Sequence, residues 1–106
     1  DNISPIKIEN DLLKIDFVEQ TLVYGDNKPY LVALLVLNKE KSDIPDEIIL
    51  KDLEIVNKNL SKIEKIKKFI VIKDQFTIEN GLITPTLKLK RYKIIQKYKN
   101  ELENLY

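Results

Sequence analysis

The sequence of 106 residues contains no cysteine, histidine, methionine or tryptophan. Without cysteine, the chain has no disulfide framework, no thiolate nucleophile and no cysteine-ligated zinc or iron–sulfur site. Without histidine, Ser-His-Asp catalysis, Cys-His catalysis and imidazole metal sites are excluded. Any chemistry of this chain must therefore come from lysine, arginine, carboxylate, hydroxyl or backbone groups.

Glycine and long apolar segments are also scarce. Gly25 and Gly81 are the only glycines, so the chain carries neither a Walker phosphate-binding loop nor a dinucleotide fingerprint. The longest apolar run, at residues 30–37, is far shorter than the ~18–20 residues that a membrane-spanning helix needs. Acidic residues stand near the N-terminus, where a secretory signal would be basic and then apolar. The lack of cysteine and of such a signal favours a cytoplasmic protein.

Arginine is nearly absent, because Arg91 is the only arginine beside seventeen lysines. The 18 basic and 17 acidic residues leave a net charge of +1. A dedicated nucleic-acid binder usually has a strong basic excess, so this balance argues against that class. With 43% hydrophobic and 33% charged residues, the composition is typical of a soluble globular protein. A chain of this length is the size of one domain with a modest core.

The N-terminal residues predict a short helix. Ser4 can cap the free amide groups of its first turn, and Pro5 suits the first helical position. Ile3 would then pack against Ile8 as a hydrophobic staple. The buried face of this helix is expected to hold Ile8, Leu12 and Ile15.

Three strands are expected, and the first two form a hairpin. Residues 17–24 nearly alternate apolar and polar side chains, which is typical of a half-buried strand. Residues 30–37 are apolar on both faces, which is typical of a central strand. The turn-forming cluster at residues 25–29 joins these two segments. Residues 69–72 are the third predicted strand.

Two further helices and a second hairpin complete the prediction. Residues 46–64 carry an apolar stripe at helical spacing, formed by Ile49, Leu53, Val56, Leu60 and Ile63. Residues 91–106 form the last predicted helix. Asn80-Gly81 between two short apolar segments predicts a hairpin over residues 76–84. The sequence therefore predicts an α+β fold, with a small sheet built from hairpins and flanking helices.

The densest polar feature lies between the second hairpin and the last helix. Two hydroxyls, two lysines and the only arginine fall within eight residues, namely Thr84, Thr86, Lys88, Lys90 and Arg91. A lysine held on a loop can bring positive charge to a phosphate or carboxylate as charge develops there. The alternative is a solvated basic helix start, which the lysine-rich composition favours. A basic cluster at a helix N-terminus is unfavourable with the helix dipole, however, so it needs a separate reason.

Other polar features have simpler structural explanations. The lysines between residues 58 and 73 could face an anion or RNA, but they also suit the C-terminal dipole of the preceding helix. Glu79 could act as a base, but a plain hairpin accounts for its segment. Glu9 and Asp11 are interpreted as capping charges in an early helical turn. The five tyrosines are expected at the edge of the core rather than in a base-stacking platform.

Residues 76–91 carry a recognisable pattern, F-T-I-E-N-G-L-I-T-P-T-L-K-L-K-R. This stretch closely resembles the C-terminal domain of long-chain fatty-acyl-CoA synthetases, which belong to the adenylate-forming superfamily. The resemblance extends to four further segments, at residues 4–10, 23–34, 57–60 and 64–69. It therefore covers essentially the whole chain. We expect residues 1–106 to be a single C-terminal lid domain with the lid fold of that superfamily.

The resemblance implies a role for one residue above all. The family carries a Thr-x-Ser/Thr-Gly-Lys-x-x-Arg motif, whose positions are matched by Thr84, Thr86, Lys88 and Arg91. Lys88 would bridge the fatty-acid carboxylate and the ATP α-phosphate during acyl-adenylate formation. The domain would then rotate for thioester formation with CoA. Leu87 departs from the motif, because the wider superfamily has glycine there, whereas the long-chain branch tolerates other residues.

The resemblance also implies what lies outside this chain. The sequence begins with aspartate rather than methionine, so we expect an excised or processed piece of a longer protein. ATP, Mg and CoA would be bound mainly by a large N-terminal domain, and the fragment alone would be inactive and hold no metal. Expected partners are that domain, fatty acid, ATP and CoA, with no nucleic acid, and peripheral membrane association is compatible with a cytoplasmic location. The alternative is a free-standing basic module that binds RNA or an acidic protein.

Overall fold

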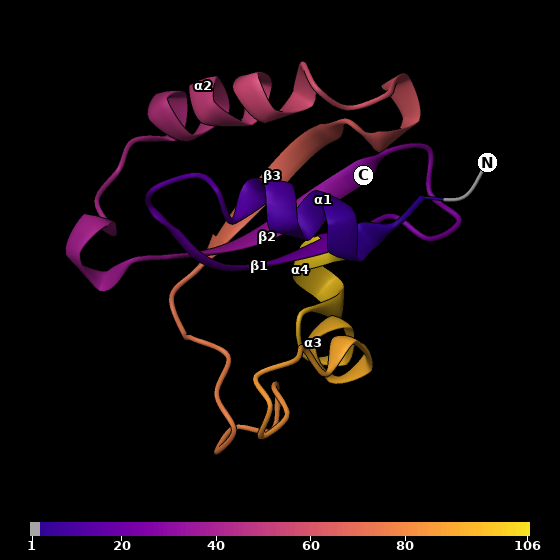
Figure 1. The fold of residues 1–106 in the computed structure, drawn as a ribbon. Coiled ribbons are helices and arrows are strands. Elements are labelled where there is room, and N and C mark those ends of the chain that lie inside the picture. Colours follow the sequence, from indigo (N-terminus) through magenta and orange to yellow (C-terminus); the bar gives the residue numbers. More distant parts are fainter. Residues whose placement is uncertain (1–2) are drawn as a thin grey trace.

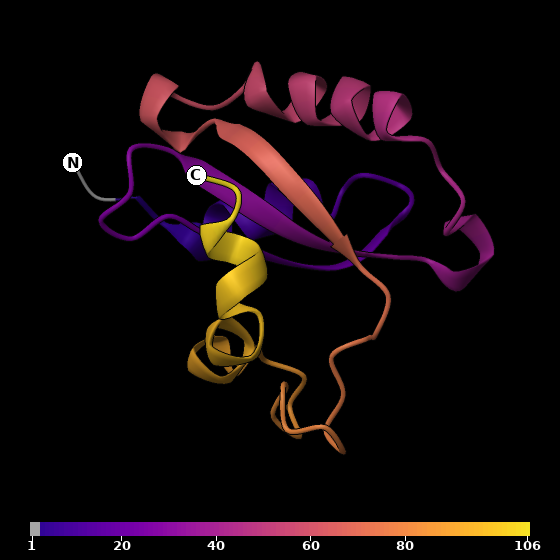
Figure 2. The same cartoon turned by 180° about the vertical axis from the view of Figure 1, so that it is seen from behind.

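Residues 3–106, which the computed structural model describes, form a small three-stranded mixed sheet with helices on both faces (Figures 1 and 2). The elements follow the order α1 (Pro5–Leu12), β1 (Val18–Tyr24), β2 (Leu31–Leu37), α2 (Asp46–Asn57), β3 (Ile66–Ile72), α3 (Arg91–Lys97) and α4 (Lys99–Glu103). Two short 3₁₀ helices, η1 (Lys39–Lys41) and η2 (Lys62–Glu64), flank α2. The predicted α+β class with flanking helices is confirmed.

β2 is the central strand of the sheet. All seven of its residues are buried, as expected for a segment that is apolar on both faces. β1 pairs with it antiparallel through the predicted hairpin, with Leu22 opposite Leu34. β3 pairs with the other side of β2 in parallel, with Ile70 opposite Leu34. A parallel neighbour requires a crossover connection, and α2 provides it.

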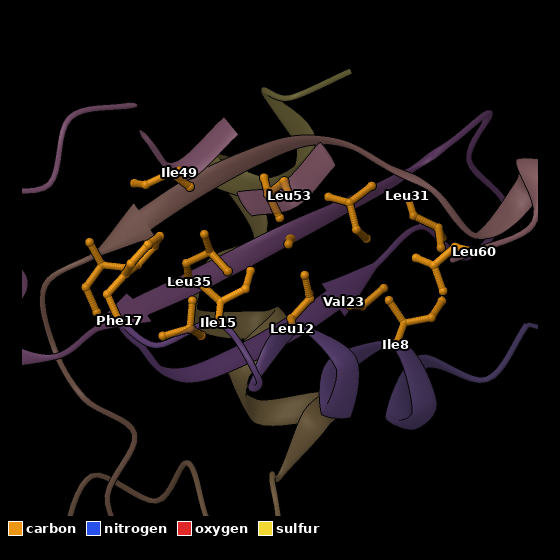
Figure 3. Packing of buried hydrophobic residues seen from close by; sticks show 14 residues of the cluster. Ile8, Leu12, Ile15, Phe17, Val23, Leu31, Leu35, Ile49, Leu53 and Leu60 are labelled. Carbon is orange, nitrogen blue, oxygen red and sulfur yellow. The ribbon is translucent and has the colours of Figure 1, made fainter. Parts of the chain in front are cut away.

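The alternation of side chains along β2 divides the core into two clusters, one on each face of the sheet. Ala33 and Leu35 belong to the cluster that packs with α1 and α2, around Leu12 and Leu53 (Figure 3). The opposite face packs with α3, α4 and the segment before them, through Leu34, Phe76, Ile94, Tyr98 and Leu102. The segment that carries residues 84–91 is therefore anchored on the face opposite to α2.

The predicted start of α1 is confirmed. Ser4 Oγ accepts a hydrogen bond from the backbone N–H of Lys7 at 3.3 Å, and Pro5 is the first helical residue. Ile3 packs against the cluster that contains Ile8, as the predicted staple requires. This helix start is therefore set by local sequence.

α2 is shorter than predicted, because it ends at Asn57 rather than at residue 64. The Asn57 side chain accepts from the backbone N–H of Ile66 and donates to the carbonyl of Ile66, both at 2.9 Å, so it ties the helix end to β3. Ile63 therefore leaves the buried stripe and is 49% exposed. The last turn of α2 holds no basic residue. The interpretation of Lys62 and the lysines after it as charges that complement the dipole of this helix is wrong.

The second hairpin, predicted over residues 76–84, is also wrong. The Asn80 side chain replaces the strand ladder, because its Oδ1 accepts from the backbone N–H of Thr77 at 2.9 Å and of Leu82 at 3.2 Å. The Asn80 amide also donates to the carbonyl of Gln75 at 2.9 Å. Gly81 has a φ of 78°, which suits the turn that this network closes. The segment is thus a side-chain-stabilised turn without paired strands.

The last helix, predicted over residues 91–106, is interrupted. Tyr98 has φ −106° and ψ 24°, so it separates α3 from α4. The buried stripe continues through this break, since Ile94, Tyr98 and Leu102 all lie in the second cluster. Tyr92 points the other way and is 74% exposed, so it does not lie at the core edge as predicted.

A polar network holds the C-terminal residues against the turn between β1 and β2. Glu103 accepts hydrogen bonds from Tyr24 Oη and from Lys28 Nζ, each at 2.5 Å. Tyr30 Oη donates to the carbonyl of Leu105 at 2.7 Å, and Tyr106 Oη donates to the carbonyl of Tyr30 at 2.8 Å. These three tyrosines lie in the core or at its edge, as predicted. We call this group the C-terminal clasp.

The clasp predicts a specific loss of stability in acid. Hydrogen bonds from Lys28 and Tyr24 lower the pKa of Glu103 from 4.5 to about 2. Because the folded-state pKa is the lower one, the clasp stabilises the fold above pH 4.5, and this contribution is lost as the pH falls toward about 2. Urea unfolding across this range should show that Glu103→Gln removes this part of the pH dependence.

The matched control for this measurement is Glu101→Gln, at an exposed position of the same helix. It is expected to keep the wild-type dependence on pH. An identical pH dependence for wild type and Glu103→Gln would contradict the role assigned to the clasp.

Candidate functional site

Residues 84–88 form a tight loop that carries Lys88 at its end. The backbone N–H of Thr84 donates to the carbonyl of Lys88 at 2.8 Å, and the N–H of Lys88 donates to Thr84 Oγ1 at 3.0 Å. The N–H of Leu87 donates to the carbonyl of Thr84 at 2.8 Å. The hydroxyls of Thr84 and Thr86 lie 3.0 Å apart, within hydrogen-bond distance. Threonine hydroxyls and backbone bonds thus shape this loop together.

The base of the loop is closed by backbone pairing. Ile83 and Leu89 form an isolated antiparallel bridge. The N–H of Lys90 donates to the carbonyl of Leu82 at 2.8 Å. This pairing fixes the direction in which residues 84–88 leave the body of the domain.

Lys88 is exposed on this loop. Its ammonium group takes part in none of the ion pairs found within residues 3–106, whereas Lys28 and Lys41 are each paired with a carboxylate. A flexible ammonium group that is free of partners can approach an anionic ligand without first breaking an ion pair. The structure thus places Thr84, Thr86 and Lys88 on one loop, in a form suited to contact with a phosphate or carboxylate.

Leu87 adopts a backbone conformation that is rare for its side chain. Its φ is 66°, in the left-handed region that costs a residue with a Cβ roughly 1–2 kcal/mol. The loop bonds made by Thr84 on either side of Leu87 hold it there. Leu87 is the position at which the resembling motif has glycine, and the positive φ explains physically why glycine suits it.

Arg91 reaches away from the loop and binds a buried carboxylate. Its Nη1 donates to Glu9 Oε2 at 2.6 Å and its Nη2 donates to Glu9 Oε1 at 2.7 Å. Glu9 Oε2 also accepts the backbone N–H of Val23 at 2.7 Å. The hydrogen bonds to Glu9 raise the pKa of Arg91 above its ordinary value, despite the opposing effect of burial.

Glu9 is the polar residue that sequence reasoning misplaced. It was predicted to be a capping charge, but it is only 5% exposed and lies in the second turn of α1. Asp11 pairs with the exposed Lys14 at 3.5 Å. The sequence held one signal of this burial. Glu9 directly follows Ile8 of the predicted buried face, and the single arginine elsewhere in the chain could pair with a buried carboxylate.

The remaining predicted features lie apart from this loop. Glu79 is exposed in the turn closed by Asn80, and within residues 3–106 it makes no ion pair with the loop. Lys62 and the lysines that follow it lie around η2 and β3. Figures 1 and 2 both show the segment before α3 at the end of the molecule opposite to α2.

A groove of about 520 Å³ lies beside the loop, between the loop, α1 and β1. Lys88 and Arg91 line it, together with the polar side chains of Glu19 and Gln20 and a group of exposed apolar side chains that we call the apolar rim. The rim consists of Ile6, Leu13 and Leu87, which are 63%, 44% and 70% exposed. Exposed apolar side chains gathered around a charged group are typical of a surface that contacts another molecule or domain.

Within residues 3–106, no group of three or more carboxylates is placed to hold a metal ion. In the same part of the chain, no helix has the length and apolar character needed to cross a membrane. The groups that the loop offers are an ammonium and two hydroxyls, which suit an anionic ligand.

The left-handed conformation of Leu87 predicts an unusual order of stability. Leu87→Gly should be more stable than Leu87→Ala by about 1 kcal/mol, because glycine adopts a positive φ at no steric cost. Urea unfolding of the two variants measures this difference. At Leu50, an exposed position inside α2, the order should be reversed by about 1 kcal/mol. If Leu87→Ala were as stable as Leu87→Gly, this would contradict the backbone strain assigned to residue 87.

Burial of Glu9 predicts a large effect of removing its charge. Glu9→Gln leaves the partly buried Arg91 without its counter-ion, so the free energy of unfolding should fall by about 2–4 kcal/mol. Asp11→Asn, which removes the contact of a half-buried carboxylate with the exposed Lys14, should cost less than about 1 kcal/mol. Chemical denaturation of both variants tests this contrast. Equal small losses would contradict the stabilising role assigned to the Glu9–Arg91 pair.

Comparison with known proteins places these features in a family. The sequence model of the AMP-binding enzyme C-terminal domain matches residues 1–106. A chloroplast long-chain-fatty-acid–[acyl-carrier-protein] ligase of Arabidopsis thaliana is 33% identical over all of this chain and 16% of its own length. Long-chain-fatty-acid–CoA ligase 6 of Rattus norvegicus is 32% identical over 98% of this chain and 18% of its own length. This chain thus spans less than a fifth of these relatives.

Solved structures agree with these matches. The adenylation domain of a carboxylate reductase from Mycobacterium chelonae is 33% identical, with a TM-score of 0.88 over 98% of this chain and 18% of that chain. The adenylation–carrier didomain of a carboxylic acid reductase from Segniliparus rugosus, in complex with AMP, is 29% identical, with a TM-score of 0.87 over 98% of this chain and 16% of that chain. The chain belongs to the family of AMP-binding enzyme C-terminal domains, and its three-stranded sheet with flanking helices is the fold of that domain in adenylate-forming enzymes.

Proposed function

We propose that this chain is the mobile C-terminal domain of an ATP-dependent ligase that joins long-chain fatty acids to CoA. In this proposal residues 1–106 make up the whole lid, and the ATP and fatty-acid sites lie in a large N-terminal domain elsewhere in the protein. The family match and the fatty-acid ligases among the relatives support it. The observation that carries it is Lys88, exposed and without an ion-pair partner at the end of a braced loop.

Lys88 would act in the first half-reaction. A carboxylate oxygen of the fatty acid attacks the α-phosphorus of ATP, pyrophosphate leaves, and the acyl adenylate forms. Both reactants are anionic, so a lysine between them reduces their repulsion and stabilises the charge that develops in the transition state. Mg, when bound to the N-terminal domain, would supply further charge stabilisation on the phosphates.

Thr84 and Thr86 would serve this reaction by shaping the loop. Thr84 bonds the loop at three points, through its N–H, its carbonyl and its hydroxyl, and so sets where the Lys88 backbone lies. Thr86 carries a hydroxyl next to that of Thr84 and is exposed. In the assembled site it is available to donate to a phosphate oxygen.

Domain rotation would separate the two half-reactions. In the second, a thiol sulfur attacks the acyl carbonyl carbon and AMP leaves, a step for which Lys88 is not needed. The exposed apolar rim of Ile6, Leu13 and Leu87 around the groove supports a surface that is covered in one orientation and uncovered in the other.

The acceptor thiol has two candidate sources. CoA is proposed because ligases that use it are among the relatives, at 32% identity. A carrier protein is the second candidate, because a relative at 33% identity is named a ligase for acyl-carrier protein. Thioester formation from supplied acyl adenylate, with CoA or with a phosphopantetheinylated carrier protein, would distinguish the two. The family match favours either acceptor over a free-standing module for RNA or an acidic protein.

The role of Lys88 is tested in the full-length enzyme. Lys88→Ala should reduce fatty-acid-dependent ATP–pyrophosphate exchange by about 10²–10³-fold, the usual loss for a group that stabilises transition-state charge. Thioester formation from supplied acyl adenylate should change much less. Lys93→Ala, an exposed lysine on α3, is the control and should leave both rates unchanged. Wild-type exchange in Lys88→Ala would disprove the assignment.

A further inference from the structure

We propose that Arg91 is a positioning residue for Lys88, held in place by the buried carboxylate of Glu9. The inference rests on the proposed function of Lys88. It assigns Arg91 a role that needs no contact with the substrate, because Nη1 and Nη2 of its guanidinium are both bound to the buried carboxylate of Glu9.

Glu9 provides a rigid anchor for this purpose. Both carboxylate oxygens accept from Arg91, at 2.6 and 2.7 Å, and one of them also accepts the N–H of Val23 at 2.7 Å. Within residues 3–106, no buried side-chain nitrogen or oxygen lacks a hydrogen-bond partner. A bidentate pair fixes orientation as well as distance, so the anchor leaves Arg91 little freedom to move.

The pair spans the edge of the sheet. β1 is an edge strand, and Glu9 accepts a hydrogen bond from the backbone N–H of Val23 on that edge. Glu9 belongs to α1, which packs on one face of the sheet, whereas Arg91 begins α3, which packs on the other face. The Glu9–Arg91 pair, with the bond from Val23, therefore joins α3 to α1 and β1, which lie near the other end of the chain.

The loop base lies outside the ladder of the sheet. Residues 73–90 contain no helix and no strand of the sheet. Apolar packing of Leu82 and Ile83 holds the base against the second cluster. Its backbone pairs with residues nearby in the chain, through the bridge of Ile83 with Leu89 and the bond of Lys90 to Leu82. Arg91 directly follows this base, three residues after Lys88, and links it to the sheet. A displacement of the Glu9–Arg91 pair would therefore also displace Lys88.

Only arginine can make this link. The chain uses lysine at seventeen positions and arginine only at 91. An ammonium group cannot bind both oxygens of one carboxylate in a fixed plane, whereas a guanidinium can. The pair also explains how a basic residue can begin α3, since the Glu9 carboxylate offsets the unfavourable dipole of that helix end.

The test uses the full-length enzyme and measures the two half-reactions separately. Arg91→Ala should lower the kcat of fatty-acid-dependent ATP–pyrophosphate exchange by about 10–100-fold, because small displacements of a reacting group are costly. Arg91→Lys should show a smaller loss in the same direction. The KM for ATP and the rate of thioester formation from supplied acyl adenylate should change little.

Two controls separate positioning from folding. Glu103→Gln weakens the C-terminal clasp, so it should destabilise the domain. It should not reduce the rate of one half-reaction more than the rate of the other. The double variant Lys88→Ala, Arg91→Ala should exchange no more slowly than Lys88→Ala alone, because a residue that acts through Lys88 has no effect once Lys88 is gone.

Four results would overturn the inference, and they can be told apart. Wild-type exchange in both Arg91 variants, together with a large loss in Lys88→Ala, would reject the role of Arg91 and keep the proposed function. Equal losses in both half-reactions would show a purely structural role, and a further loss in the double variant would show that Arg91 acts independently of Lys88. Wild-type exchange in Lys88→Ala would reject the proposed function itself. If Arg91→Ala does not fold, Arg91→Lys decides between these outcomes.

Discussion

The structure depends on the burial of β2 on both of its faces. A strand with seven buried residues in succession needs apolar cover from two directions, and a chain of this length must divide its helices to supply it. α1 and α2 therefore cover one face, while α3, α4 and the preceding segment cover the other. This division places the first helix and the last part of the chain on opposite sides of one thin sheet. The edge of that sheet is where they can meet, and Glu9 and Arg91 meet there.

Two sets of charged residues in the domain differ in their physical roles. Glu9, Arg91, Lys28 and Glu103 are engaged in short contacts that link distant parts of the chain, and their charges are largely compensated within the fold. Lys88 is exposed on a loop whose shape is set by other residues. An uncompensated cation on a braced loop suits a domain that completes the site of a larger protein. The lack of histidine and cysteine is compatible with such a contribution, because a single lysine needs neither.

Much of the fold could be predicted from local patterns, and two of the failures involve asparagine side chains. Ser4 and Pro5 predicted the start of α1, and the apolar run at residues 30–37 predicted the central strand. At two of the wrong predictions, the hairpin around Asn80 and the extended α2, an asparagine side chain forms hydrogen bonds with backbone groups that the local pattern does not indicate. Asn80 closes its own turn, and Asn57 ties its helix end to β3. Whether an asparagine does this depends on which backbone groups the fold brings within its reach.

The sequence by itself determined the secondary-structure elements with strong periodicity, the loop motif around Lys88 and the family to which the domain belongs, because these depend on residues that lie near one another in the chain. Only the tertiary structure decided the role of Glu9 and the direction of Arg91. Their contact joins residues 82 positions apart, and no local pattern predicts such a pairing. The tertiary structure also showed the positive φ of Leu87. That conformation follows from hydrogen bonds on both sides of the residue, which form only when the loop is closed on the folded domain.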